Sequence, residues 1–303
     1  MKKPLRSLPP AKRRELDHAV AVLRQGFAEA TATRKAPRLK DGRILKIILF
    51  GSYARGDWVH DPIGRYFSDF DLLVVVDHED LTDWEFWQAA EDRLLADMTA
   101  GQGLRTPVSL IVHSLDDVNH RLEHGRSFFI DIVRDGVTLF DTPGVDFVQP
   151  QSLPPATALK EARESYDEMS ESVSEFVDLA DVSRARGYSR KAAFLLHQAT
   201  ETLYSGLLLV LTGYSPKSHK LTSLRKLTEP LVPGLADAWP HETKLQRRSF
   251  ELLRAAYVKG RYSKHFKITD EELGYLFERI ARLKATIEDA SSRRLSELAG
   301  ASV

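Results

Sequence analysis

Apolar positions in the first half of the chain follow two different periods. From residue 11 to about residue 31 they recur at helical spacing, with charged residues between them. Residues 44–50 and 70–76 are instead short apolar runs rich in Ile, Leu and Val, a pattern typical of buried strands. The same reasoning predicts a loop at 34–43, helices at 83–98, 115–123 and 128–134, and strands at 107–112 and 137–140.

The pattern changes after residue 141. Residues 141–157 contain four prolines and no sustained periodicity, so they are the best candidate for a linker. Beyond them every long segment has helical spacing, and the helices are expected at 158–184, 189–212, 218–228, 242–259 and 270–295. We therefore expect an α+β protein with an α/β domain over 1–145, a linker at 146–157 and an all-α domain over 158–303.

Composition narrows the classes of function. The 43 Lys and Arg residues balance the 43 Asp and Glu residues, so the overall charge indicates neither a long polyanion nor a membrane surface as partner. The chain has no cysteine, which excludes disulfides, thiolate metal sites and a cysteine nucleophile. No apolar run approaches the roughly 20 residues that a membrane helix needs. We expect a cytoplasmic protein.

A glycine and a serine follow the first strand, and a short helix is expected after them. Glycine at position 51 would let the backbone approach a phosphate group closely, and the start of the helix would offer unpaired N–H groups. Ser52 adds a hydroxyl donor, and Arg55 could add a charge-assisted contact. This segment is a candidate phosphate-binding turn.

Two aspartates stand at the start of the second strand. Asp69 and Asp71 are two positions apart, so in a strand their side chains point to the same face. Carboxylate oxygens of this kind hold Mg²⁺, which keeps room for water and substrate phosphates. Either motif alone is commonly structural, but both in this order, followed by an apolar strand, favour nucleotide and metal binding.

These motifs resemble a known family. GSYARG at 51–56 and SDFDLLVVV at 68–76 are similar to the minimal nucleotidyltransferases of the DNA polymerase beta superfamily, over about residues 40–145. The resemblance implies a short mixed sheet. It also implies that Gly51 and Ser52 bind the phosphates of a nucleoside triphosphate, and that Asp69 and Asp71 are catalytic ligands of Mg²⁺. Arg55 matches the glycine motif.

The chain departs from this family at two places. Residues 53–68 form a longer gap than usual, so 58–67 is interpreted as an inserted loop over the site. Ser109 stands where the family has its third carboxylate, and the spacing of Asp116 and Asp117 does not suit them as replacements. Two functions remain open, a transferase that moves a nucleoside monophosphate to an unidentified acceptor and a nucleotide-binding regulator without transfer activity.

The second half resembles a HEPN domain over about residues 158–290, and the whole order resembles fused bacterial nucleotidyltransferase–HEPN proteins. Many HEPN domains are metal-independent ribonucleases, which implies a third possible function, a toxin–antitoxin-like fusion acting on RNA. Arg261 and His265 are the candidate pair, and a continuous helix would place them on one face. Histidine would move a proton while arginine stabilises the phosphate charge. A noncatalytic anion-contacting face and a solvated helix end are the alternatives, and the resemblance implies a homodimer.

Other histidines in this half receive structural interpretations. His197 and Glu201 are four residues apart, and we favour a hydrogen bond between helices over a metal site. His219 is expected to cap or pack against the next helix. An apolar stripe is interpreted as core or dimer interface, and its members are Leu203, Leu207, Val210 and Leu211.

Overall fold

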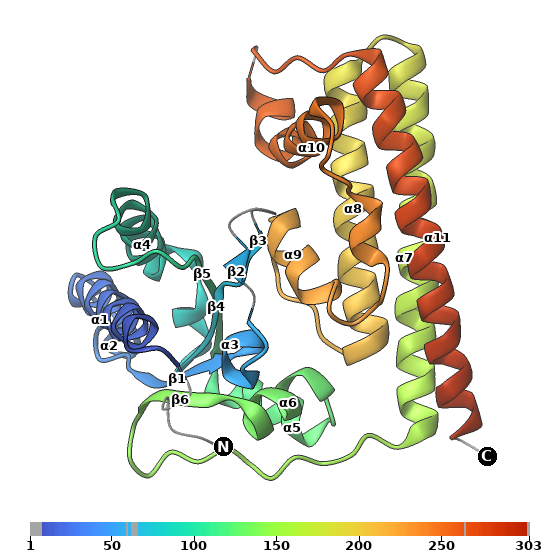
Figure 1. Cartoon of the computed structure of the whole chain (residues 1–303). Helices are drawn as coiled ribbons and strands as arrows, with labels where there is room; N and C mark the ends of the chain where they lie inside the picture. Colours follow the sequence, from blue (N-terminus) through green and yellow to red (C-terminus); the bar gives the residue numbers. More distant parts are fainter. Residues whose placement is uncertain (1–7, 59, 62–65, 264, 302–303) are drawn as a thin grey trace. The chain divides into compact units, whose positions relative to one another are not determined.

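The chain divides into two compact units, residues 1–152 and 153–303. The structure is a computed structural model that describes residues 8–58, 60–61, 66–263 and 265–301 (Figure 1). Among these residues no helix is long and apolar enough to cross a membrane. Each unit is described by itself.

A mixed sheet forms the centre of the first unit. It contains β1 (Ile44–Phe50), β4 (Phe70–Val76), β5 (Val108–Ser114) and β6 (Val137–Asp141), in the order β5-β4-β1-β6. β1 is antiparallel to β4 and β6, whereas β4 and β5 are parallel. Because β1 is central, all of its residues are buried, which explains its uninterrupted apolar sequence. The expected α+β class with a short mixed sheet is confirmed.

Helices cover this sheet. α1 (Pro10–Ala32) and α4 (Gln88–Ala100) lie on one side, and α5 (Leu115–Glu123) and α6 (Ser127–Asp135) lie on the other (Figure 1). α1 is tied to the segment before β5, because the buried Glu15 carboxylate accepts hydrogen bonds from the backbone N–H groups of Arg105 and Thr106 at 3.0 and 2.9 Å. Burial opposes ionisation of Glu15, but hydrogen bonds from the Thr106 hydroxyl and the Arg105 N–H, together with the Lys12 ammonium, outweigh it and lower its pKa.

Two sequence predictions for this unit were wrong in detail. The expected loop at 34–43 contains α2 (Pro37–Lys40), which begins on a proline whose fixed φ suits the first helical position. The helix expected from residue 83 begins at Gln88, after two 3-10 turns at Glu79–Thr82 and Trp84–Phe86. The reason is Trp87, whose buried indole donates a hydrogen bond to the carbonyl of Leu81 at 2.8 Å and so closes these turns.

The described residues of the second unit form helices joined by turns and loops, without a strand. α7 (Pro155–Ala185), α8 (Ser189–Thr212) and α11 (Asp270–Gly300) run side by side, and α9 (Leu221–Thr228) and α10 (Lys244–Tyr262) pack against α8 (Figure 1). Capping boxes begin α10 at Thr243 and α11 at Thr269. The all-α expectation for this half is confirmed.

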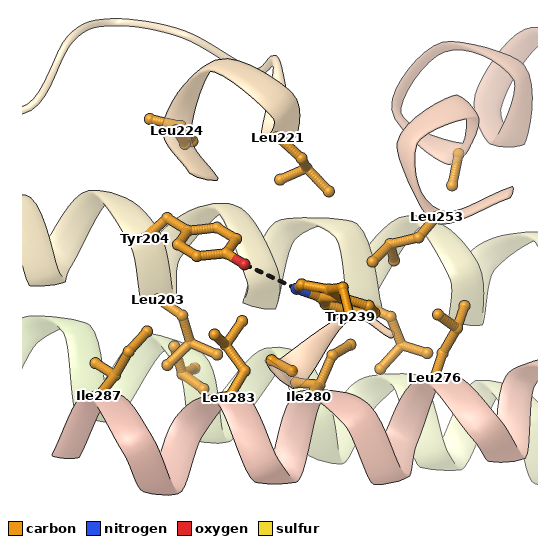
Figure 2. Close-up of a cluster of buried hydrophobic side chains, with 14 of the residues drawn as sticks. Leu203, Tyr204, Leu221, Leu224, Trp239, Leu253, Leu276, Ile280, Leu283 and Ile287 are labelled. Atoms are coloured by element: carbon orange, nitrogen blue, oxygen red, sulfur yellow. Dashed lines mark hydrogen bonds between the residues drawn. The ribbon is translucent and has the colours of Figure 1, made fainter. Parts of the chain in front are cut away.

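The core of the second unit surrounds one buried hydrogen bond. The indole of Trp239 donates to the hydroxyl of Tyr204 at 2.7 Å, among leucine and isoleucine side chains from α8, α9, α10 and α11 (Figure 2). Burial raises the pKa of the Tyr204 phenol. In the expected apolar stripe of α8, Leu203 and Leu207 belong to this core and Leu211 packs against it. Val210 is buried in a separate small cluster with Ala162 and Leu295. Its interpretation as core is therefore confirmed.

Candidate functional site

The pairing of β1 with β4 brings Asp71 against Gly51. Asp71 lies opposite Phe50, the last residue of β1, and Gly51 follows directly. Gly51 has φ +72°, which favours glycine, and a Cβ atom built on it would overlap the carboxylate Oδ2 of Asp71. The position therefore requires glycine for two independent reasons. In the seven residues of β4, all described, Asp71 is the one that is not buried.

The segment after Gly51 is a single helical turn. α3 (Gly51–Arg55) ends at Gly56, which has φ +91°, and the Ser52 carbonyl accepts the N–H groups of Gly56 and Asp57 at 2.8 and 3.1 Å. The helix expected after the first strand is therefore present, as one short turn. Contacts to a phosphate here would come from the backbone around Gly51 and from the half-buried Ser52.

Arg55 forms an ion pair in the same turn. Its Nε lies 3.2 Å from Oδ2 of Asp57, and both side chains are about half exposed, 47% and 60%. An exposed pair of this kind contributes only about 0–1 kcal/mol, so the guanidinium can exchange Asp57 for a phosphate at little cost. The structure leaves the binding role of Arg55 a prediction.

Aromatic packing holds the turn after β1 against the start of β4. Tyr53 is 3% exposed, stacks on Trp58 with ring centroids 5.2 Å apart, and contacts Phe70 at 4.5 Å. Burial raises the pKa of its phenol, and the negative charges of Glu15 and Asp69 raise it further. In the inserted segment, residues 60–61 and 66–67 pair as two short antiparallel strands. Residues 59 and 62–65 lie outside the described residues, so the loop over the site stays a prediction.

The position of the missing third carboxylate is now defined. In the parallel register of β4 and β5, Ser109 is the direct neighbour of Asp71, so their side chains share one face of the sheet. Asp117 follows the end of β5, where Ser114 pairs with Val76. At about 3.3 Å per residue, five residues of strand separate Ser109 and Ser114 by about 16 Å. Asp117 therefore lies too far along the sheet to replace Ser109.

Asp117 is also engaged elsewhere. Its carboxylate bonds His113 at 2.6 Å and Arg121 at 2.8 Å. Burial opposes ionisation, but these two partners outweigh it and hold the Asp117 pKa well below its usual range. Within the described residues no group of three His, Asp or Glu side chains is arranged to hold a metal ion. Asp69 and Asp71 offer hard oxygen donors of the kind Mg²⁺ takes, and substrate phosphates and water would have to complete its shell.

In the second unit, the expected Arg261–His265 pair is not on one helix. α10 ends at Tyr262, and His265 lies in the following turn, where its N–H donates to the Ser263 hydroxyl at 3.2 Å. The helical face that would have joined the two side chains is therefore interrupted. The prediction that one continuous helix carries both Arg261 and His265 is therefore wrong.

His197 makes the hydrogen bond between helices that its sequence position suggests. Its Nδ1 lies 2.9 Å from the Leu253 carbonyl of α10, and a carbonyl only accepts, so Nδ1 carries a proton. The other ring nitrogen, Nε2, faces the Oε2 atom of Glu201 at 3.5 Å. His197 is 1% exposed and Glu201 16%, so this carboxylate is held in a largely dry environment.

Glu201 also holds a second histidine. Its Oε1 lies 2.8 Å from Nδ1 of His219, whose ring stacks on Tyr257 with centroids 4.4 Å apart. His219 thus packs against α8 and α10, whereas the sequence led us to expect the next helix. The Arg261 guanidinium lies over the same Tyr257 ring at 4.3 Å. We call these five residues, His197, Glu201, His219, Tyr257 and Arg261, the histidine cluster.

Sequence reasoning named four members of the histidine cluster but paired only His197 with Glu201. His197 and Glu201 come from α8, His219 from the segment before α9, and Arg261 from α10. Periodicity compares residues within one helix, so it gives no signal for side chains that meet from different elements.

Comparison with known proteins agrees with this division of the chain. Residues 33–102 match the family model described as a nucleotidyltransferase domain, and residues 166–290 match that of the HEPN domain. A protein of Methanocaldococcus jannaschii named "Putative protein adenylyltransferase" is 58% identical over 36 residues. That stretch is 12% of this chain and 30% of the relative, so the likeness to the relative is local. Both resemblances, in the expected order, are confirmed.

The contact between Gly51 and Asp71 gives a testable prediction. Gly51→Ala should lower the free energy of unfolding by about 1–2 kcal/mol from backbone strain and by about 1–3 kcal/mol more from overlap with the carboxylate. Gly101→Ala is the matched control, because Gly101 has a similar φ of +67° and nothing near its would-be Cβ. Urea unfolding measures both, and adding Asp71→Ala should restore only Gly51→Ala. Equal losses at the two glycines would contradict the contact.

Proposed function

We propose that this nucleotidyltransferase–HEPN protein transfers a nucleoside monophosphate from a Mg²⁺-bound nucleoside triphosphate to the hydroxyl of an acceptor. The observation that carries the proposal is the Asp71 carboxylate packed against the backbone of Gly51, within the residues that match the nucleotidyltransferase family. A phosphate seated on Gly51 and Ser52 would lie beside the two carboxylates. The acceptor oxygen would attack the α-phosphorus, and pyrophosphate would leave.

The residues present have separate tasks in this reaction. Gly51 and Ser52 would bind the phosphates through N–H and hydroxyl donors, with Arg55 adding positive charge. Asp69 and Asp71 would hold Mg²⁺, which supplies charge neutralisation at the phosphates when bound. The buried Tyr53 would have a structural task, because its ring packs the turn after Gly51 against Phe70 of β4.

The donor and the acceptor are proposed more specifically from the relative. Its name describes a protein adenylyltransferase, which supports ATP as donor and a protein hydroxyl as acceptor. The absence of cysteine supports a cytoplasmic, reducing location as part of the same proposal. We also propose a homodimer, for which the exposed Leu179 and Val182 of α7 offer an apolar surface.

Ser109 bears on whether the protein transfers a nucleotide or only binds it. A serine hydroxyl beside Asp71 neither provides a negative metal ligand nor takes a proton from the acceptor at neutral pH. Binding of the triphosphate needs Gly51, Ser52 and the two aspartates, so it does not depend on position 109. The regulator that binds nucleotide without transfer remains the alternative within this class.

A transfer assay tests the main proposal. Incubation of the purified chain with ATP labelled at the α-phosphate and Mg²⁺ should label an acceptor and release pyrophosphate, and Asp69→Ala should abolish both. Asp92→Asn, an exposed aspartate of α4, is the control that should behave as wild type. Magnesium-dependent ATP binding without label transfer would identify the regulator. Absence of both binding and transfer would refute the nucleotide site.

A substitution at Ser109 tests the role of the third position. Ser109→Asp should raise the rate of Mg²⁺-dependent transfer by about tenfold or more, because it adds a carboxylate on the same face as Asp71. Ser109→Asn is the matched control of similar size without charge, and it should leave the rate near that of wild type. A folded Ser109→Asp variant with unchanged turnover would show that this position does not limit the chemistry.

A second candidate function is favoured by the histidine cluster. Glu201 bonds Nδ1 of His219 and leaves its Nε2 on the exposed side, since the His219 side chain is 56% exposed. A carboxylate held this way fixes the tautomer of an imidazole and makes Nε2 the proton acceptor. In RNA cleavage, Nε2 would take the proton of a 2′-hydroxyl as it attacks the adjacent phosphorus. A 2′,3′-cyclic phosphate forms, the 5′-oxygen leaves with a proton from water, and Arg261 stabilises the phosphate charge.

Substitutions of His219 and His265 distinguish this ribonuclease site from the Arg261–His265 pair that the sequence suggested. With EDTA present, His219→Ala should abolish cleavage of a single-stranded RNA, and Glu201→Ala should reduce it strongly by releasing the imidazole. His265→Ala is the control and should retain cleavage. Loss of cleavage in His265→Ala with retention in His219→Ala would restore Arg261 and His265 as the pair, and intact RNA in the wild type would reject this candidate.

A further inference from the structure

The helical unit contains a cavity that neither proposed activity uses. Its volume is about 580 Å³, and it lies between the turn from α7 into α8 and the segment from α10 into α11. The lining residues come from these two stretches and from one position of α10; they are Gly187, Tyr188, Ser189, Arg190, Lys191, Arg248, Phe266, Lys267, Ile268 and Thr269. Arg261 and His219 are not among them.

The charged residues that line this cavity are all positive. Four of its ten described residues are cationic and none is acidic, although the whole chain has equal numbers of positive and negative residues. Arg190 donates to the Ser263 carbonyl at 3.2 Å, and Arg248 pairs with Glu272. Lys191 and Lys267 form no ion pair within the described part of the chain. The Lys191 ammonium lies over the ring of Tyr188, 5.5 Å from its centroid, and both lysines are exposed. Two lysines that line the cavity therefore lack a counter-charge from these residues.

The walls that carry these cations are well fixed. Phe266 and Ile268 are 6% and 8% exposed and anchor the segment between α10 and α11 in the core. The capping box of α11 joins Thr269 to Glu272, and the same Glu272 carboxylate bonds Arg248 at 2.5 Å. Because one carboxylate links two walls, the spacing of the cations does not depend on a ligand. Such preorganisation lowers the cost of binding.

We propose that this cavity binds a small oligophosphate of about the size of pyrophosphate. Its volume falls in the range of pockets for small ligands, roughly 300–1,000 Å³. Arginine forks and lysine ammonium groups bind phosphate oxygens through charge-assisted hydrogen bonds. Four cations around one cavity match an anion that concentrates its charge, whereas an acidic peptide carries one charge per residue and spreads it along an extended chain. The site is separate from Gly51 and Asp71.

Calorimetry with inorganic pyrophosphate tests the proposal. The full chain is used with Asp69→Asn and Asp71→Asn, in EDTA, so that metal-dependent binding in the first unit does not contribute. We expect one pyrophosphate per chain, with an affinity that falls as salt increases. Lys191→Gln and Lys267→Gln should each weaken binding by about tenfold, the effect of one lost hydrogen bond to a charged group. Lys160→Gln, an exposed lysine of α7, should not change it.

Three results would overturn the proposal. The first is no heat of binding in the millimolar range, and the second is an equal affinity in Lys191→Gln, Lys267→Gln and Lys160→Gln. The third is tighter binding of a hexa-aspartate peptide than of pyrophosphate, which would make the cavity a docking site for an acidic protein segment. Circular dichroism of each variant shows that the helices are intact, and the exposed positions of both lysines make this the expected result.

Discussion

The register between β1 and β4 is the constraint on which the nucleotide site depends. β1 is buried along its whole length, and β4 is buried everywhere except at Asp71. A slip of one residue in such a pair would turn every side chain to the opposite face, so the buried apolar residues fix the pairing. That pairing sets Asp71 opposite Phe50 and against Gly51. Burial of the apolar residues of β1 and β4 therefore stabilises the geometry of the site, and the polar contacts of the site itself need to contribute little free energy.

A different principle organises the polar residues of the helical unit. Glu201 is largely buried, and a buried carboxylate is costly unless it is paired and hydrogen-bonded. His219 supplies a hydrogen bond on one oxygen, and His197 faces the other. The Leu253 carbonyl fixes a proton of His197 on Nδ1, and Nε2 of the same ring lies 3.5 Å from Oε2 of Glu201. The hydrogen bond between Glu201 and His219 anchors the segment before α9.

Sequence patterns predicted the parts of this protein that depend on neighbours along the chain. The expected limits of β1, β4 and α8 agree with the structure, because each is a sustained apolar pattern that ends at a glycine, a polar residue or a turn. The sequence also placed Gly51 directly after β1 and Asp71 within β4, because these strands are unambiguous, while the binding roles of both residues stay predictions. Patterns could not show that α10 stops at Tyr262, or that His219 reaches Glu201. Both follow from packing between elements, which leaves no period in the sequence.

The neighbourhood of Asp71 also explains why binding and transfer can separate in this fold. A third carboxylate at Ser109 would place a like charge on the same face as Asp71, and like charges this close are unfavourable until a cation binds. Serine removes that repulsion and also removes a metal ligand. The Gly51–Asp71 contact is unaffected, because it is set by β1 and β4 and not by β5. In the proposed function, the phosphates would therefore be bound by residues that the core strands β1 and β4 hold in place, whereas the rate of transfer would depend on Ser109 of the neighbouring edge strand.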